Sequence, residues 1–337
     1  MKKAVLGALQ IVLPLALGLW LVFYFYDQLD HDQREELFQA FRDAHWGWLC
    51  LCIVIGWLSH LSRAWRWRYL LRHLGYTVPI TNAYHATMIG YFMNLLLPRA
   101  GEASRAMALQ RTEGVPFAQG FGTILAERAV DLIGLAAIAL TTVLLQLDDL
   151  QLYMDRIQAF GGGATQADDG APWLPWLVGA LVLTAVILGY LVWVRPSWRE
   201  RVRSVGAGLW QGILSVWHTR DKGWFILHTA IIWGLYVLMF GVGSLALEAT
   251  AQVPVAGIMA GFVAGTVGIV LVQGGIGVYP AFVALIVSIH MPAVDGGLVH
   301  PAALAIGWLL WVAQTAMLIL LGGLSLILIR RRPAVAP

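Results

Sequence analysis

The sequence contains few charged residues and few cysteines. Only 12% of its 337 residues are Asp, Glu, Lys or Arg, and 59% are hydrophobic, whereas soluble domains have about 25% charged residues. The mean hydropathy is +0.72. The two cysteines, Cys50 and Cys52, head an apolar run and are interpreted as small apolar residues, not as a redox or metal pair. This composition excludes a soluble globular protein and predicts an integral membrane protein.

Sequence motifs of catalysis and metal binding are also missing. The histidines near apolar runs do not have the paired spacing of zinc ligands, and no Ser-His-Asp order, nucleophile elbow or Walker sequence is found. These histidines are His60, His85, His228 and His290. We therefore expect no enzyme activity, no cofactor, no metal site and no use of ATP.

Long apolar stretches dominate the sequence, each near the length that crosses a hydrocarbon core. The first is predicted to be a retained helix, because it is too long for a signal peptide and lacks a cleavage site. No segment between the stretches is long enough for a soluble domain. The stretches are Val5 to Tyr26, Trp46 to Leu61, Ile80 to Leu97, Phe117 to Leu147, Trp173 to Val194, Trp224 to Leu247, Pro254 to Val272 and Pro301 to Ile329.

The distribution of charge predicts which segments face the cytoplasm. Basic residues alternate with aromatic ones from Arg63 to Arg72, as is typical of a cytoplasmic membrane interface, and this position argues against a nucleic-acid patch. The segment from Arg195 to Gly223 and the end of the chain are also basic. The acidic segments, Asp27 to His45 and Asp148 to Ala171, are predicted outside. The first has the period of an amphipathic helix with an apolar stripe of Leu29, Leu37, Phe38 and Phe41.

An even number of crossings must separate the two basic segments, but three apolar runs lie between them. We therefore predict that the chain enters with Ile80 to Leu97, turns at Pro98 and returns as a helix to about Thr112. The second half repeats this layout inverted, with an apolar pair from Pro254 to His290 broken at residues 273–280. Discontinuous segments at matching positions of inverted halves are typical of transporters.

The predicted fold class is thus an all-α polytopic membrane protein with about six full transmembrane helices and two broken or re-entrant hairpins in an inverted repeat. The first half covers residues 1–147 with its hairpin at 80–112, an external loop covers 148–172, and the second half covers 173–332 with its hairpin at 254–290. The protein is predicted to lie in the cytoplasmic membrane, with both termini in the cytoplasm.

Single-cysteine labelling in a background free of Cys50 and Cys52 tests this topology. We expect labels between Arg63 and Arg72 and between Arg195 and Gly223 to react from the cytoplasm, and labels between Asp27 and His45 to react from outside. A label at Glu113 that reacts only from outside would contradict the first re-entrant hairpin.

The first hairpin and the following helix place charges at membrane depth. Each costs about 2.5–3.5 kcal/mol at the bilayer centre, so six independent charges would cost roughly 15–20 kcal/mol. They must pair, reach water or hold a charged ligand. The charges are Arg99, Glu102, Arg105, Glu127, Arg128 and Asp131.

Two interpretations of these charges remain open. A carboxylate between Arg99 and Arg105, together with free N–H groups at a helix start, makes a site for an anion such as phosphate. Alternatively, Glu127 and Asp131, which share a helix face, hold the hairpin in a buried ion-pair network. Asn94, just before the break, has the character of a group that satisfies freed backbone.

The second hairpin carries small residues and an unwound turn. Gly257, Gly261 and Gly265 recur every four residues, which predicts close helix packing. Gly274 and Gly275 permit a non-helical backbone, tolerated at this depth only where it is buried or lines a cavity. The polar groups Gln273 and Tyr279 flank the turn, and together these four residues are candidates for substrate binding.

The motifs N-LLLP-R-A-GE-x-x-R, ERAVD and VQGGIGVYPA together resemble the membrane domain of lysylphosphatidylglycerol synthases, a family of flippase-like proteins. The resemblance covers most of the chain, although Gln273 replaces a proline and Tyr279-Pro280 stands where a glutamate is usual. The residues that match its first motifs are Asn94, Pro98, Arg99, Gly101, Glu102, Arg105, Glu127, Arg128 and Asp131.

The resemblance implies that the protein moves a lipid or lipid-linked head group across the bilayer and does not synthesise it. The expected partners are a membrane phospholipid or polyprenyl-linked lipid, without nucleic acid. Two alternatives stay open. One is a small-solute secondary transporter that uses an intramembrane carboxylate for proton coupling. The other is a non-catalytic membrane subunit that positions a cytoplasmic partner enzyme through its basic segment.

Overall fold

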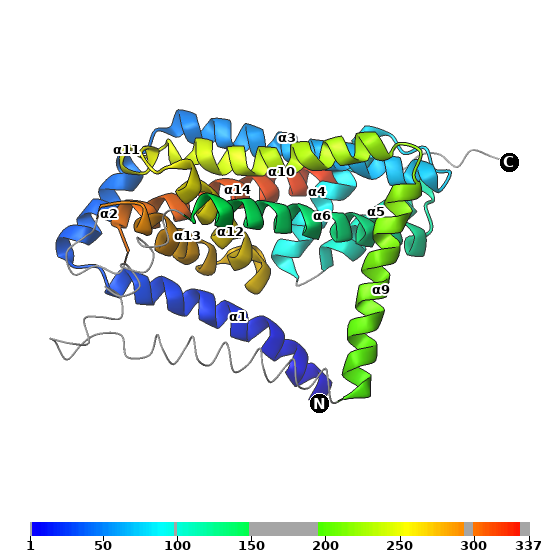
Figure 1. The fold of residues 1–337 in the computed structure, drawn as a ribbon, viewed down its shortest axis with the longest axis horizontal. Helices are drawn as coiled ribbons and strands as arrows, with labels where there is room; N and C mark the ends of the chain where they lie inside the picture. The colour runs from blue at the N-terminus through cyan, green and yellow to red at the C-terminus, as the bar shows by residue number, and fades with distance from the viewer. Residues whose placement is uncertain (1, 98–99, 148–194, 293–298, 331–337) are drawn as a thin grey trace.

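The computed structural model describes residues 2–97, 100–147, 195–292 and 299–330. The regular elements in these ranges are all helical (Figure 1). They are α1 (Lys2–Asp27), α2 (His31–Asp43), α3 (Trp46–His73), α4 (Ile80–Leu96), α5 (Ala100–Glu113), α6 (Phe117–Leu145), α9 (Pro196–His218), α10 (Lys222–Ser244), α11 (Glu248–Ala251), α12 (Val255–Leu271), η2 (Gln273–Gly275), α13 (Val278–Ile289) and α14 (Pro301–Leu328).

Within the described ranges, α3, α6, α10 and α14 are long and apolar enough to cross a membrane. They run in similar directions along the long axis of the molecule (Figure 1), and α3 packs along α10. Shorter apolar helices are formed by Leu15–Asp27, Val255–Leu271 and Val278–Ile289. The prediction of an all-α polytopic membrane protein is confirmed. The predicted span from Trp173 to Val194 and the external loop lie outside the described residues.

The helix pair predicted on either side of Pro98 is present. α4 ends at Leu96 and α5 begins at Ala100, and the two helices pack against each other. The two backbones approach closely where Gly90 lies against Gly101, because neither residue has a side chain. A Cβ on Gly101 would overlap the carbonyl oxygen of Gly90. The hairpin therefore depends on glycine at the crossing point, and its re-entrance into the membrane stays a prediction.

The second hairpin packs in the predicted manner. Gly257, Gly261 and Gly265 of α12 lie directly against side chains of α13. Between the helices, Gly274 and Gly277 have φ of 68° and 70°, values that favour glycine. The carbonyl of Gly274 accepts a 2.6 Å hydrogen bond from the indole N–H of Trp311 in α14. The break is thus an ordered turn.

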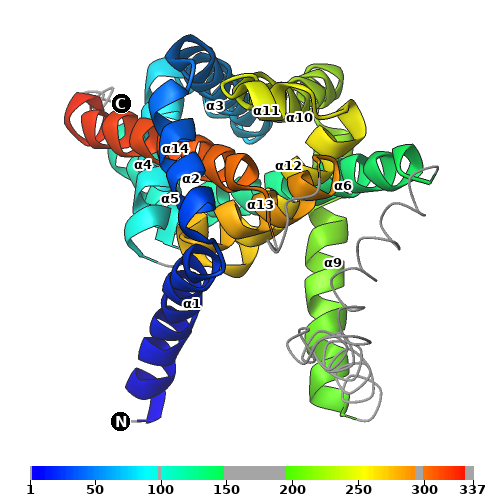
Figure 2. The same cartoon turned by 90° about the vertical axis from the view of Figure 1, so that its left-hand side faces the viewer.

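Two helices lie across the direction of the long ones. α2 begins with a capping box in which Asp30 and Gln33 exchange side-chain and backbone hydrogen bonds, and it packs against α14. Its apolar stripe is only partly as predicted: Leu29 and Leu37 are buried, but Phe38 is 50% exposed. Phe38 follows Leu37 by one position, about 100° around the helix, and so points away from α14. The second transverse helix, α9, stands almost at right angles to the long helices in both views (Figures 1 and 2).

Candidate functional site

Two arginines of α3 lie inside the protein. Arg63 is 5% exposed and Arg66 is fully buried, so their interpretation as interfacial residues was wrong. They are three residues apart and therefore share a helix face, which is turned toward α6 and α10. The more distal Arg68 and Arg72 lie near the end of α3 and are partly or fully exposed. Their place at a cytoplasmic interface stays a prediction. Arg72 pairs with Asp221 at 3.0 Å.

The buried arginines are neutralised by the acidic face of α6. Asp131 accepts from Arg63 at 2.5 Å and from Arg66 at 2.8 Å. Arg66 also donates to the hydroxyl of Thr229 in α10 at 2.9 Å. Asp131 therefore ties α3 to α6. Among the described residues its partners are arginines of α3 and not Arg105 of the hairpin.

Glu127 makes the contact to the hairpin that the sequence predicts. It is 1% exposed and accepts from Arg105 of α5 at 2.8 Å, while the Nε of Arg66 lies 3.5 Å from its other oxygen. The guanidinium of Arg105 stacks on the ring of Trp67 at 3.7 Å. Glu127 thus joins α3, α5 and α6 at one point.

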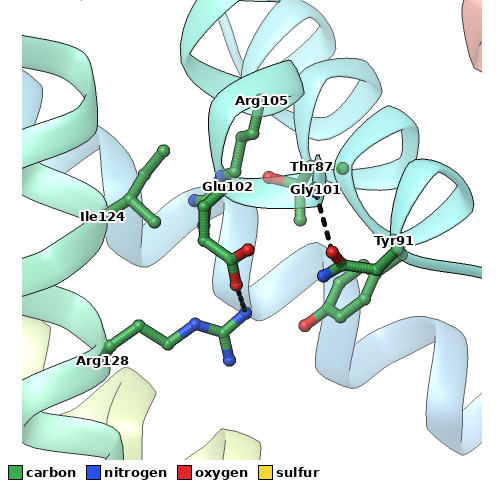
Figure 3. Close-up of a pocket in the computed structure, with 9 residues that line it drawn as sticks. Thr87, Tyr91, Gly101, Glu102, Arg105, Ile124 and Arg128 are labelled. Atoms are coloured by element: carbon green, nitrogen blue, oxygen red, sulfur yellow. Dashed lines mark hydrogen bonds and ion pairs between the residues drawn. The ribbon is translucent and has the colours of Figure 1, made fainter. Parts of the chain in front are cut away.

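Glu102 has a different partner from the one predicted. It pairs at 2.8 Å with Arg128 of α6, and this pair is partly solvent-exposed (Figure 3). The predicted neighbour Arg105 does not pair with Glu102, because its guanidinium turns inward to Glu127. Arg99, the other predicted neighbour, lies outside the described residues.

Asn94 has the role suggested by its place before the break. Its side-chain oxygen accepts a 2.7 Å hydrogen bond from the backbone N–H of Gly101. This N–H belongs to the first turn of α5, which has no intrahelical acceptor for it. Asn94 therefore closes the hairpin across its turn.

A small cavity lies between α4, α5 and α6 beside these groups (Figure 3). Its volume of about 20 Å³ is enough for roughly one water molecule. The Nε and Nη2 of Arg105 have no hydrogen-bond partner in the part of the chain that the structure describes. The cavity lining consists of Thr87, Gly90, Tyr91, Asn94, Gly101, Glu102, Arg105, Ile124 and Arg128.

The described residues of the charged cluster comprise four arginines and three carboxylates, an excess of one positive charge. Guanidinium N–H groups without a partner and a net positive charge are the features that attract an anion. We define the charged cluster as Arg63, Arg66, Glu102, Arg105, Glu127, Arg128 and Asp131. No group of three or more potential metal ligands is found among the residues that the structure covers.

Three candidates of the second hairpin, Gly274, Gly275 and Tyr279, do not line this cavity. Tyr279 is 8% exposed and packs against Gly265 and Gly275 in the core. Gly274 lies near Leu95 at the end of α4, so the turns of the two hairpins approach each other. Gln273 starts the second turn. A direct role of these four residues in binding stays a prediction.

Sequence reasoning missed four residues of the site: Arg63, Arg66, Trp67 and Tyr91. The spacing of Arg63 and Arg66 was a signal, because two charges on one face of a long apolar helix predict a buried partner. Trp67 had no such signal. Its indole N–H donates to the hydroxyl of Thr123 at 2.8 Å, which fixes the ring under Arg105.

Two curated proteins from archaea are similar to parts of this chain. The protein named Glycosyltransferase AglD of Haloferax volcanii is 29% identical over 161 residues, which are 45% of this chain and 26% of that protein. The UPF0104 membrane protein MJ1595 of Methanocaldococcus jannaschii is 29% identical over 87 residues, 25% of this chain and 26% of its own length. The chain thus spans about a quarter of the length of each. No solved structure matches it significantly.

The family comparison covers nearly the whole chain. Residues 11–317 match the family described as the lysylphosphatidylglycerol synthase TM region. This range contains both hairpins, the charged cluster, the long apolar helices α3, α6 and α10, and the first part of α14. The chain therefore belongs to the lysylphosphatidylglycerol synthase transmembrane-region family.

Proposed function

We propose that the protein moves a phosphate-bearing lipid, or a lipid-linked head group, across the bilayer of the cytoplasmic membrane and carries out no covalent chemistry. The observation that supports this most is the state of Arg105. Its guanidinium is buried, one of its nitrogens is hydrogen-bonded to Glu127, and two others have no hydrogen-bond partner among the described residues. Arg105 also lines the cavity. A guanidinium binds phosphate oxygens through two parallel N–H groups.

The cavity must enlarge for such a head group, since it holds about one water molecule. The contact that can yield is the pair between Glu102 and Arg128, because its side chains are 22% and 44% exposed. Exposed pairs contribute at most about 1 kcal/mol. We propose that an approaching phosphate replaces Glu102 as the ion-pair partner of Arg128. The hairpin can then separate from α6.

The substrate class in this proposal is an anionic phospholipid or a polyprenyl-linked lipid. Both carry a phosphate next to an apolar chain, which matches a cationic site in an apolar bundle. Similarity to a protein named as a glycosyltransferase is in keeping with a sugar-bearing lipid, although the match covers 26% of that protein. The proposed orientation places both termini in the cytoplasm.

Replacing Arg105 with lysine tests the site. Lysine keeps the charge but cannot present a planar fork. The loss of one charge-assisted hydrogen bond costs about 1.5–3 kcal/mol, which corresponds to a roughly 10- to 100-fold slower rate. We expect this decrease for an anionic reporter lipid in reconstituted liposomes. Arg111→Lys is the matched control, because Arg111 lies on the same helix, is exposed and does not line the cavity.

A wild-type rate equal to that of protein-free liposomes, for several head groups and with a pH gradient imposed, would contradict lipid transport. A proton-dependent flux of a small solute that Glu102→Gln abolishes would instead favour the secondary transporter, since the cavity accepts small species and Glu102 lines it. If the wild-type protein transports neither the lipid nor the solute, the result would favour the partner-positioning subunit.

A further inference from the structure

A second and larger cavity lies away from the charged cluster, where α3 ends and α6 begins. Its volume is about 420 Å³, within the range of small-molecule sites. Leucines and glycines form most of its wall, and a few polar groups lie among them. The lining consists of Leu70, His73, Leu74, Gln119, Gly122, Thr123, Leu125, Ala126, Gly208, Gly212 and Ser215.

Helix α9 covers this cavity and lies across the long helices (Figures 1 and 2). If the long apolar helices follow the membrane normal, α9 lies parallel to the membrane plane. Its C-terminal part is anchored at Gly212, where a Cβ would lie 3.1 Å from the Cα of Ala126 in α6. Trp210 and Trp217 are each 61% exposed. Exposed tryptophans on such a helix are typical of the bilayer interface.

Basic residues lie on both sides of the part of α9 that lines the cavity: Arg203 precedes Gly208 in the chain, and Arg220 and Lys222 follow Ser215. Arg203 and Arg220 are exposed and form no ion pair with the described residues. The ammonium of Lys222 lies 5.0 Å from the ring centre of Trp217, near the C-terminal end of α9. An apolar cavity with an interfacial, cationic edge complements a hydrocarbon chain that carries a negative head group.

We infer that this cavity binds one acyl chain of an anionic phospholipid whose phosphate lies against the basic edge of α9. The bound lipid would be a resident lipid, distinct from the lipid transported. Thr123 and Trp67 lie between this cavity and Arg105. Thr123 lines the cavity, its hydroxyl accepts a hydrogen bond from the indole of Trp67, and that indole stacks on Arg105. Binding there supports α9 and the wall of the charged cluster together.

Lipid-dependent thermal stability of the purified full chain tests this inference. Dioleoylphosphatidylglycerol is titrated into the protein in detergent, with dioleoylphosphatidylcholine as the zwitterionic comparison. We expect a saturable rise in Tm with the anionic lipid, since a ligand that binds only the folded state stabilises it. We expect little or no rise with the zwitterionic lipid.

Cavity-filling variants locate the effect. No atom lies within 4 Å of a Cβ placed on Gly122 or Gly208, so leucine fits in the empty space. Leucine also favours helix more than glycine does, so Gly122→Leu and Gly208→Leu should fold and lose the lipid-induced rise in Tm. Gly206→Leu is the matched control, because Gly206 has equal space on α9 and does not line the cavity; it should keep the rise.

Three results would overturn the inference: an undiminished rise in both cavity-filling variants, an equal rise with the zwitterionic lipid, or a rise that Arg105→Lys abolishes. The last would place the lipid at the charged cluster. Arg203→Gln combined with Arg220→Gln should reduce the rise with the anionic lipid to that of the zwitterionic one. These measurements report binding, so a failure of the transport proposal leaves their outcome unaffected.

Discussion

Replacing Asp131 with asparagine is expected to lower the free energy of unfolding by about 3–5 kcal/mol, the cost of leaving a buried charge without its partner. Asp131 is the hydrogen-bonded counter-charge of both Arg63 and Arg66, and all three side chains are less than 10% exposed. The asparagine side chain fits the same space but carries no charge. Thermal unfolding in detergent, followed by the loss of soluble protein, measures the effect.

Glu102→Gln is the matched control, because it also neutralises an acid of the charged cluster. Its partner Arg128 has a side chain that is 44% exposed, so water can solvate the charge, and we expect a loss of at most about 1 kcal/mol. Adding Arg63→Gln to Asp131→Asn should recover part of the lost stability, since it removes one stranded charge. Equal stability of Asp131→Asn and wild type would show that water reaches the pair.

Replacing Gly101 with leucine should separate the two helices of the first hairpin. Its Cβ would overlap both the carbonyl oxygen of Gly90 and the side-chain amide of Asn94. The carbonyl is a backbone group and cannot rotate away. Overpacking of this kind costs about 1–3 kcal/mol. We expect a lower Tm in detergent and no translocation of the anionic reporter, because α5 carries Arg105.

Gly323→Leu in α14 is the comparison for this change, since no atom lies within 4 Å of a Cβ there. It should leave the Tm and translocation close to wild type. Normal transport by Gly101→Leu would mean that the tight crossing of α4 and α5 is not needed for function, and the hairpin would lose its proposed role.

Much of the fold could be predicted because membrane helices follow local rules. Apolar runs of the right length predicted α3, α6, α10 and α14, and the proline after Leu97 predicted the end of α4 within one residue. The glycines at 274 and 275 predicted the turn between α12 and α13, where both adopt positive φ. In each case a short stretch of sequence contains the whole physical cause.

The pairing within the charged cluster could not be predicted in the same way. The i, i+4 spacing placed Glu127 and Asp131 on one face of α6, but it does not say which helix packs there. That face meets α3 as well as α5, so Asp131 pairs with arginines 65 and 68 residues earlier in the chain. Alternating basic and aromatic residues predicted a membrane interface for Arg63 and Arg66. The sequence alone does not show that α3 packs against α6, so their burial there could not be predicted.

The same separation along the chain imposes an order on synthesis. Arg63 precedes Asp131 by 68 residues, and at about 5–20 residues per second the ribosome needs roughly 3–14 seconds to make that stretch. Throughout that interval α3 exists without its counter-charge. Water, lipid phosphates or the insertion machinery must therefore solvate the guanidiniums of Arg63 and Arg66 until α6 has been synthesised. We expect α3 to reach its final depth in the membrane only after that.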